Sequence, residues 1–214
     1  NTGDTSSYKI NKIPELKISI DDFMYKNNKL GHLNLLATKP TENVINIDEL
    51  NFSKPGFNIN TNGSWSKIDG IDKSNFYIKL ESVSIEKMFE TFNYETANIK
   101  NGKTLIEINT EWVGSPMDFQ MKNLNGQLNM NIEKGQFLDI EPKAGRLFGL
   151  LSIQALPRRL SLDFADLFNE GFAFDSIKGN FNLENGQAYT NNLQMIGPSG
   201  DIMISGRTGL VAED

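Results

Sequence analysis

Residues 106–112, IEINTEW, decide the fold of this chain. Ile106, Ile108 and Trp112 share one parity, and glutamate or asparagine occupies every position of the other parity. Such a period of two is typical of a strand with one face buried. The same alternation recurs in both directions, at residues 16–20, 76–80 and 128–132, and in shorter form at 33–35, 45–47, 57–59, 181–183 and 202–204. The sequence therefore predicts a mainly β protein.

Turn signals separate these segments. Gly, Asn or Pro occurs at residues 54–56, 62–63, 101–102, 134–135 and 185–186, in patterns suited to a tight reversal. Strands spaced about ten residues apart, with few helices between them, predict an antiparallel meander. Residues 124–130 also resemble residues 177–183 at a spacing of 53 residues, which favours a long stacked sheet over a closed globule.

Two segments break the alternation. In residues 84–94, SIEKMFETFNY, every apolar side chain from Ile85 to Phe92 lies on one helical face, so we expect a short helix there. Residues 143–156 are too densely apolar for a strand, and Pro157 ends or kinks that predicted helix. With a further short helix expected near 163–168, residues 143–168 are predicted to form an apolar helical block, which we call the cap because the resemblance described below implies that role. Its apolar side chains are Leu147, Phe148, Leu150, Leu151 and Ile153.

The composition argues against catalysis and against nucleic acid. The chain of 214 residues has a net charge of −6, no cysteine and a single histidine, His32. Disulfides, Cys-ligated metals and multi-His sites are therefore excluded within it, and a nucleic-acid partner usually needs a basic patch. His32 has the parity opposite Leu33 and is predicted to be solvated. We expect no enzyme activity, no catalytic residue, no metal and no cofactor.

The ends of the sequence suggest a piece of something longer. No apolar run reaches the roughly 18 residues of a membrane-spanning helix. The first residues, NTGDTSS, do not resemble a signal peptide, and the chain begins without Met. We therefore interpret residues 1–214 as a single elongated domain and as an internal or C-terminal fragment of a longer chain; the resemblance described below implies the C-terminal region.

The apolar faces of the strands need a cover. Too few residues are predicted helical to cover ten or more strands, so either two sheets pack face to face or one sheet curls into a trough. The alternation alone favours the sandwich. An open trough would instead hold an acyl chain, since each buried methylene contributes about 0.8 kcal/mol. Solvent-exposed Trp65 and Trp112 would indicate a third possibility, a carbohydrate-binding sandwich.

Charged residues also lie within the predicted cap. Arg146, Arg158 and Arg159 lie near Asp163 and Asp166 in the sequence. The simpler interpretation is an ion-pair network that fixes the cap against the sheet. The alternative is a basic site for a lipid head group, because arginine binds phosphate through two parallel hydrogen bonds.

The cap region and the strands around it resemble a known family. The matching pieces are Gly145-Arg-Leu-Phe-Gly-Leu-Leu-Ser152, Ala155-Leu-Pro-Arg-Arg-Leu160, Gly171-Phe-Ala-Phe-Asp175, Ile177-x-Gly179-x-Phe181 and the turn Trp112-Val-Gly-Ser-Pro116. Together they resemble the C-terminal signature of the YhdP branch of the AsmA-like proteins, most strongly over residues 76–211.

The resemblance implies a function as well as a fold. Proteins of this branch are anchored in the inner membrane of Gram-negative bacteria, cross the periplasm and are implicated in carrying phospholipid towards the outer membrane. The resemblance favours a long antiparallel curled sheet, an open groove or half-closed barrel with two or three short helices, over the sandwich. It implies three partners: phospholipid acyl chains, the inner membrane through an N-terminal anchor, and the outer membrane or one of its proteins.

The expected site is the apolar lining of that groove. The residues that we expect to line it are Ile18, Ile78, Leu80, Ile106, Ile108, Trp112, Leu128, Met130 and Ile132. The expected function is non-enzymatic transport of phospholipid between the two membranes, which supports the outer-membrane barrier. The alternative is a periplasmic scaffold that docks an envelope partner, for instance by strand addition at an exposed sheet edge, without conducting lipid.

Overall fold

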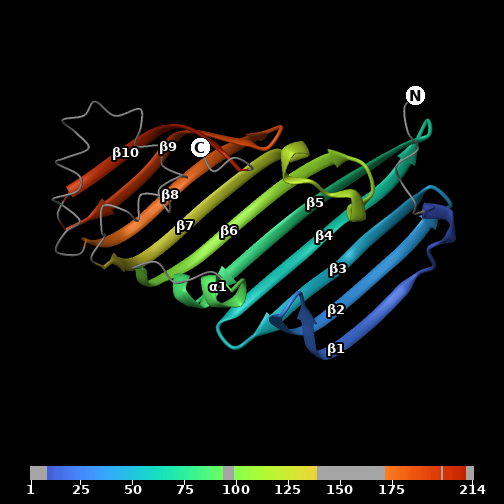
Figure 1. Cartoon of the computed structure of the whole chain (residues 1–214), viewed down its shortest axis with the longest axis horizontal. Helices are drawn as coiled ribbons and strands as arrows, with labels where there is room; N and C mark the ends of the chain where they lie inside the picture. Colours follow the sequence, from blue (N-terminus) through green and yellow to red (C-terminus); the bar gives the residue numbers. More distant parts are fainter. Residues whose placement is uncertain (1–8, 94–98, 139–171, 199, 211–214) are drawn as a thin grey trace.

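The computed structural model contains one antiparallel sheet of ten strands, arranged in the order of the sequence (Figure 1). It describes residues 9–93, 99–138, 172–198 and 200–210. The strands are β1 (Leu16–Tyr25), β2 (Asn28–Thr41), β3 (Val44–Lys54), β4 (Phe57–Ile68), β5 (Ile71–Ser82), β6 (Ile99–Val113), β7 (Asn125–Phe137), β8 (Phe172–Glu184), β9 (Gln187–Gly197) and β10 (Gly200–Gly209). The sheet twists and curls along its length, with β1 and β10 as its two edges.

These pairings confirm the predicted meander and contradict the sandwich that the alternation alone favoured. Every described strand belongs to the same sheet. The two similar segments of the sequence lie in neighbouring strands and pair with each other, so that Leu128 is opposite Phe181 and Met130 is opposite Gly179. The repeat thus reflects two strands that contribute the same alternation to one sheet.

Helical structure is scarce in the described ranges. They contain α1 (Ile85–Thr91) and the 3-10 turns η1 (Ile10–Lys12), η2 (Pro116–Asp118) and η3 (Met121–Asn123). The side chain of Ser84 caps α1, because its hydroxyl accepts a hydrogen bond from the backbone N–H of Lys87 at 3.3 Å. This confirms the helix predicted in residues 84–94 over its described part. The helices predicted within 143–168 lie outside the described residues.

The connections between strands lie at two opposite ends of the sheet. At one end α1 joins β5 to β6, beside the β1–β2 and β3–β4 turns; we call this the α1 end (Figure 1). At the other end η2 and η3 join β6 to β7, and η1 precedes β1; we call this the η end. A ligand that lies across the strands, from one edge of the sheet to the other, therefore has the α1 end on one side and the η end on the other.

Three of the predicted turns are wrong, because they lie inside strands. Residues 62–63 belong to β4, 101–102 to β6 and 134–135 to β7, whereas 54–56 and 185–186 do reverse the chain. Glycine within a strand often marks a kink or a close approach of another group. Lys134 has a φ of +57°, and a Cβ on Gly135 would lie 2.2 Å from the ring of Phe174. Gly135 is thus needed for packing.

Candidate functional site

One face of the sheet carries continuous rows of apolar side chains, and we call it the apolar face. Residues paired across neighbouring antiparallel strands point to the same side, so the register defines the rows. The first row, from β1 to β8, is Ile18, Leu35, Leu50, Thr61, Ile78, Ile108, Leu128 and Phe181. The second is Ile20, Leu33, Phe52, Ile59, Leu80, Ile106, Met130 and Gly179.

The opposite face is polar in the same register. Its central row reads Ser19, Asn34, Asn51, Asn60, Lys79, Glu107, Asn129 and Asn180. His32 also lies on this polar face, where its Nδ1 is 3.3 Å from a carboxylate oxygen of Asp21. The predicted solvated position of His32 is confirmed. A sheet with one wetted face and one apolar face needs a partner only on the apolar side.

Between the α1 end and the η end, the apolar face is only partly covered from β1 to β6, and we call this part its centre. Ile18 and Ile20, on the edge strand β1, are 37% and 39% exposed. Leu50, Ile59, Ile78, Leu80 and Ile106, which continue the rows towards β6, are half-buried. A contiguous apolar surface of this kind is more often a binding surface than one that contacts only solvent.

The C-terminal part of the same face is closed by the chain itself. Side chains of β7, β8 and β9 form a buried cluster with Ile85 of α1, and Met88 and Phe89 of the same helix pack against it. Phe174 lies over Gly135 and against Phe137, with ring centroids 5.3 Å apart. This part of the face is a packed core.

A second closed part lies at the η end of the first strands. Ile10 of η1 packs with Ala37, Ile45 and Trp65 in a separate buried cluster. The Trp65 Nε1–H donates to a carboxylate oxygen of Asp72 at 2.9 Å, and the Lys67 amine lies 3.3 Å from the other oxygen. Both partners make charge-assisted contacts, which keep the buried carboxylate of Asp72 satisfied.

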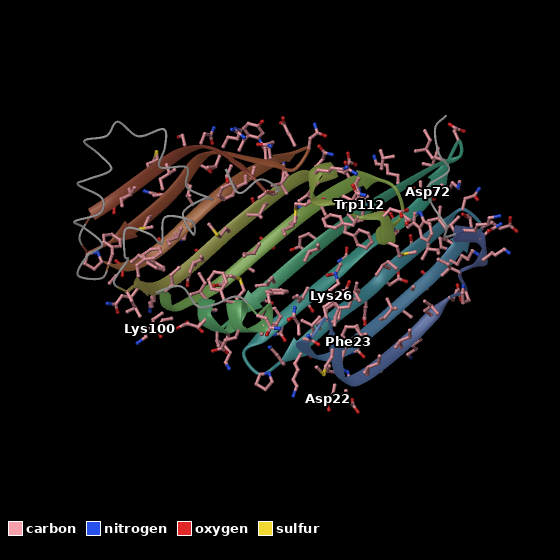
Figure 2. The ribbon with its side chains drawn as sticks, viewed as in Figure 1. Asp22, Phe23, Lys26, Asp72, Lys100 and Trp112 are labelled. Carbon is pink, nitrogen blue, oxygen red and sulfur yellow. The ribbon has the colours of Figure 1, made fainter. Side chains whose placement is uncertain are left out.

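Trp112 closes the η end further along the sheet. Its ring stacks on Phe76 at 5.4 Å between centroids and meets the edge of Phe119, which follows η2, at 5.1 Å. Its Nε1–H donates to the Ser115 carbonyl at 3.0 Å. Figure 2 shows Trp112 and Asp72 together towards this end of the strands. Because Trp65 and Trp112 are 2% and 7% exposed, neither offers the open aromatic platform that carbohydrate binding requires.

Comparison with known proteins identifies the family. The family model described as "YhdP protein" matches residues 1–214. The chain belongs to the YhdP family. It is 31% identical over 157 residues to the intermembrane phospholipid transporter YhdP of Escherichia coli strain K12; the match covers 73% of this chain and 12% of that protein. No solved structure is similar enough to be matched to it.

The structure places the residues that were expected to line a groove. All nine residues expected to line a groove lie on the apolar face: Ile18, Ile78, Leu80, Ile106, Ile108, Trp112, Leu128, Met130 and Ile132. Trp112 is covered by its aromatic neighbours, and Ile132, 5% exposed, lies in the buried cluster beneath α1. Ile108, Leu128 and Met130 are half-buried beside that cluster, so a ligand on the centre of the face would meet Ile18, Ile78, Leu80 and Ile106 most directly.

The remaining expected residues lie outside the described part of this YhdP-family chain. They are Leu147, Phe148, Leu150, Leu151 and Ile153 of the predicted cap, and Arg146, Arg158, Arg159, Asp163 and Asp166. Within the described ranges no helix has the length and apolarity to span a membrane. The cap and its charges stay predictions.

Sequence reasoning missed the polar groups that surround the apolar face. Asp72 lies buried in β5 beneath Trp65. Lys54, the last residue of β3, lies on the apolar face opposite Phe57. In the sequence, the parity of Lys54 relative to Leu50 and Phe52 was the available signal.

The polar side also has a hollow, of about 400 Å³, but its chemistry differs. Its lining includes Asn75, Asn109, Gln127, Asn182 and Glu184. Amide and carboxylate groups of this kind would have to be desolvated by an acyl chain, at a cost that burial of methylenes does not repay. The apolar face is therefore the better candidate for a lipid site.

Proposed function

We propose that this chain is one section of a phospholipid conduit, and that the centre of its apolar face carries acyl chains. The observation that supports the proposal is the pair of apolar rows, which cross eight strands and stay partly exposed at their centre. The E. coli relative is described as an intermembrane phospholipid transporter, which agrees with this use of the face.

The rows are longer than one acyl chain even without their buried end on β8. The seven strands β1 to β7, at a spacing of about 4.8 Å, extend over about 29 Å. One leaflet of a bilayer contributes about 15 Å of hydrocarbon, so the rows are longer than a single acyl chain. Each methylene buried on them contributes about 0.8 kcal/mol, and without a deep pocket no single position along the rows is strongly preferred. Such a surface holds a chain while allowing it to move along.

We extend the proposal to the parent protein on the basis of the family. The parent resides in the periplasm, is anchored in the inner membrane, acts without catalysis and delivers phospholipid to the outer membrane or to a protein there. This chain corresponds to about an eighth of the length of the curated relative, so these statements concern segments beyond it.

The competing function is a scaffold that docks an envelope partner without conducting lipid. The edge strands β1 and β10 would serve such docking by strand addition. A scaffold of this kind gains nothing from a half-exposed apolar centre, whereas a conduit requires one. This is why we favour the conduit.

A pair of adjacent substitutions tests the proposal. A conduit is a path in series, so one charge on the apolar face should block flux: Ile108→Asp should slow transport by about tenfold or more, given the cost of a carboxylate in hydrocarbon. Asn109→Asp places the same group on the polar face and should leave transport unchanged. The measurement follows newly made radiolabelled phospholipid into the outer membrane of cells that depend on the full-length protein.

Protein level and resistance to protease control for folding of both variants. Transport at the normal rate by a folded Ile108→Asp protein would contradict the conduit and favour the scaffold. Equal loss of transport in the two variants would show that flux does not depend on the apolar face.

A further inference from the structure

Lysines from three separate segments meet at the α1 end of the apolar face. Lys26 and Lys29 flank the β1–β2 turn, Lys54 ends β3, and Lys87 lies on α1. The side-chain amide of Asn93, just after α1, donates to the Asn27 carbonyl at 3.4 Å and to the Asn28 side chain. These bonds hold α1 against the β1–β2 turn and bring the lysines together.

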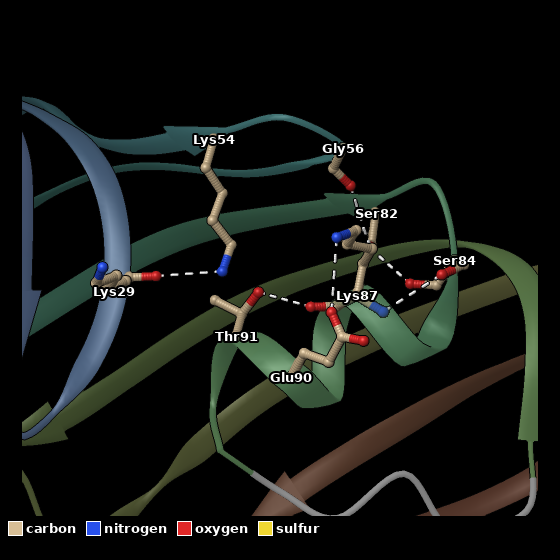
Figure 3. A network of polar contacts seen from close by, with 8 residues as sticks. All are labelled: Lys29, Lys54, Gly56, Ser82, Ser84, Lys87, Glu90 and Thr91. Carbon is tan, nitrogen blue, oxygen red and sulfur yellow. Dashed lines mark hydrogen bonds and ion pairs between the residues drawn. The ribbon is translucent and has the colours of Figure 1, made fainter.

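Lys54 is the lysine that faces the apolar side. Its amine donates to the Lys29 carbonyl at 3.2 Å (Figure 3). The same amine lies 5.7 Å from the centre of the Phe57 ring. Burial lowers the pKa of this amine, the neighbouring Lys87 amine lowers it further, and Glu90 raises it in part. Lys54 therefore carries a partly desolvated positive charge that Glu90 offsets only incompletely.

Lys87 adds a second charge with one acidic neighbour. Its amine is 3.6 Å from a carboxylate oxygen of Glu90. Both side chains of that pair are at least half exposed, so the pair is weakly held and can rearrange around an incoming group. The amines of Lys54 and Lys87 together with the carboxylate of Glu90 leave a net positive charge at this place.

Four phenylalanine side chains lie between these charges and the apolar rows. Phe23 packs on Phe52 at 5.6 Å between centroids, and Phe57 meets Phe92 edge-on at 5.8 Å. Phe52 is a member of the second apolar row and lies two residues before Lys54 on the same face. The lysines therefore adjoin the apolar side chains directly. This arrangement matches a phospholipid, whose anionic head group adjoins its apolar acyl chains.

We propose that Lys54 and Lys87 bind the phosphate of a glycerophospholipid whose acyl chains lie on the apolar face. This proposal rests on the conduit proposed above. Lysine is a compact donor that binds phosphate as a point charge, and partial burial strengthens that attraction relative to bulk water. The site gives each passing lipid an orientation, with its head group towards the α1 end.

The same two amines would also attract free phosphate, so the experiment must separate the two sources. Photoreactive p-benzoylphenylalanine replaces Phe52 in one form of the full-length protein and Ile78 in another. Position 52 reports lipid beside the lysines, and position 78 reports lipid at the centre of the face. Adducts are identified as intact phospholipid by mass spectrometry, with millimolar inorganic phosphate present or absent.

Charge-neutral variants then test the lysines. Lys54→Gln with Lys87→Gln should reduce the adduct at position 52 by about fivefold while the adduct at position 78 persists, as expected for two partly exposed ion pairs. Lys54→Arg with Lys87→Arg should restore it. The matched control, Lys17→Gln with Lys103→Gln, removes two positive charges from the polar face and should change neither adduct.

The outcomes separate this inference from the conduit itself. No phospholipid adduct at position 78 in the otherwise unmodified protein overturns the conduit. An adduct at position 78 with an adduct at position 52 that ignores the Gln substitutions overturns only the head-group site. Because the adduct is identified as intact phospholipid, a position 52 adduct that depends on the lysines supports the site, whether or not inorganic phosphate weakens it. No phospholipid adduct at position 52, with the adduct at position 78 present, overturns the lipid assignment.

Discussion

The centre of the apolar face and its C-terminal part have the same alternation of residues but differ in what covers them. At the centre, Ile18, Ile59 and Ile78 remain exposed or half-buried. On β7 to β9, side chains such as Ile132, Phe174 and Met195 are buried with one another and with α1. A period of two therefore specifies which face of a strand is apolar. The neighbouring elements decide whether that face becomes core or binding surface.

The largest effect should distinguish these two regions by stability. Phe174→Ala removes a fully buried ring from the closed part and should lower the free energy of unfolding by about 3–5 kcal/mol. Ile78→Ala, at the half-buried centre, should cost about 1–2 kcal/mol, because its side chain is only partly covered and its truncation leaves no closed cavity. Urea-induced unfolding measures both. Similar costs for the two substitutions would remove the distinction between core and binding surface.

A smaller effect should appear in the closed part at the η end. Trp65→Phe removes the N–H that hydrogen-bonds the buried Asp72 carboxylate and should cost about 1–3 kcal/mol. Trp112→Phe is the matched control, since its N–H donates to a neutral carbonyl and its loss should cost less. Thermal unfolding compares the two. A larger loss for Trp112→Phe would show that Asp72 does not depend on Trp65.

The smallest effect concerns α1, which covers the closed part. Burial raises the pKa of Glu86, but hydrogen bonds from the backbone N–H groups of Glu86 and Asn101, with help from Ser84 and Lys100, leave the pKa below its usual value. A lowered pKa in the folded state means that the carboxylate stabilises the fold above the unfolded pKa of about 4.3. That stability is lost as the pH falls through the folded pKa.

This sign gives a defined pH test. The advantage in stability of the unmodified protein over Glu86→Gln should be complete above about pH 5 and should shrink as the pH falls further. Urea midpoints at a series of pH values measure it. An advantage that stays constant down to low pH would show that the Asn101–Glu86 contact does not stabilise the charged form.

The sequence predicted the faces of the strands better than their ends. Alternation placed Ile78, Ile108 and Met130 on one side, because a strand has only two sides and the register of a meander keeps them aligned. Gly135 was interpreted as a turn because its partner, Phe174, is 39 residues away in the sequence. Which glycine bends the chain and which accommodates a ring depends on the neighbouring strand.

The candidate site was predicted in its apolar part and missed in its polar part. The rows follow from local alternation, whereas the approach of Lys54 to Lys87 depends on how α1 folds back over the ends of the strands. The same limit applies to Asp72, whose burial under Trp65 is set by pairing between β4 and β5. Charges that meet through tertiary contacts leave no periodic signal.

The most direct test of the account is a photo-crosslinking scan along β6. p-Benzoylphenylalanine is placed in turn at positions 105, 106, 107, 108 and 109 of the full-length protein in cells. We predict phospholipid adducts at Ile106 and Ile108 and none at Leu105, Glu107 or Asn109. Leu105 is the decisive position, since it is apolar but lies on the polar face. Adducts at Leu105 equal to those at Ile106, or no adducts at Ile106 and Ile108, would contradict a lipid path on the apolar face.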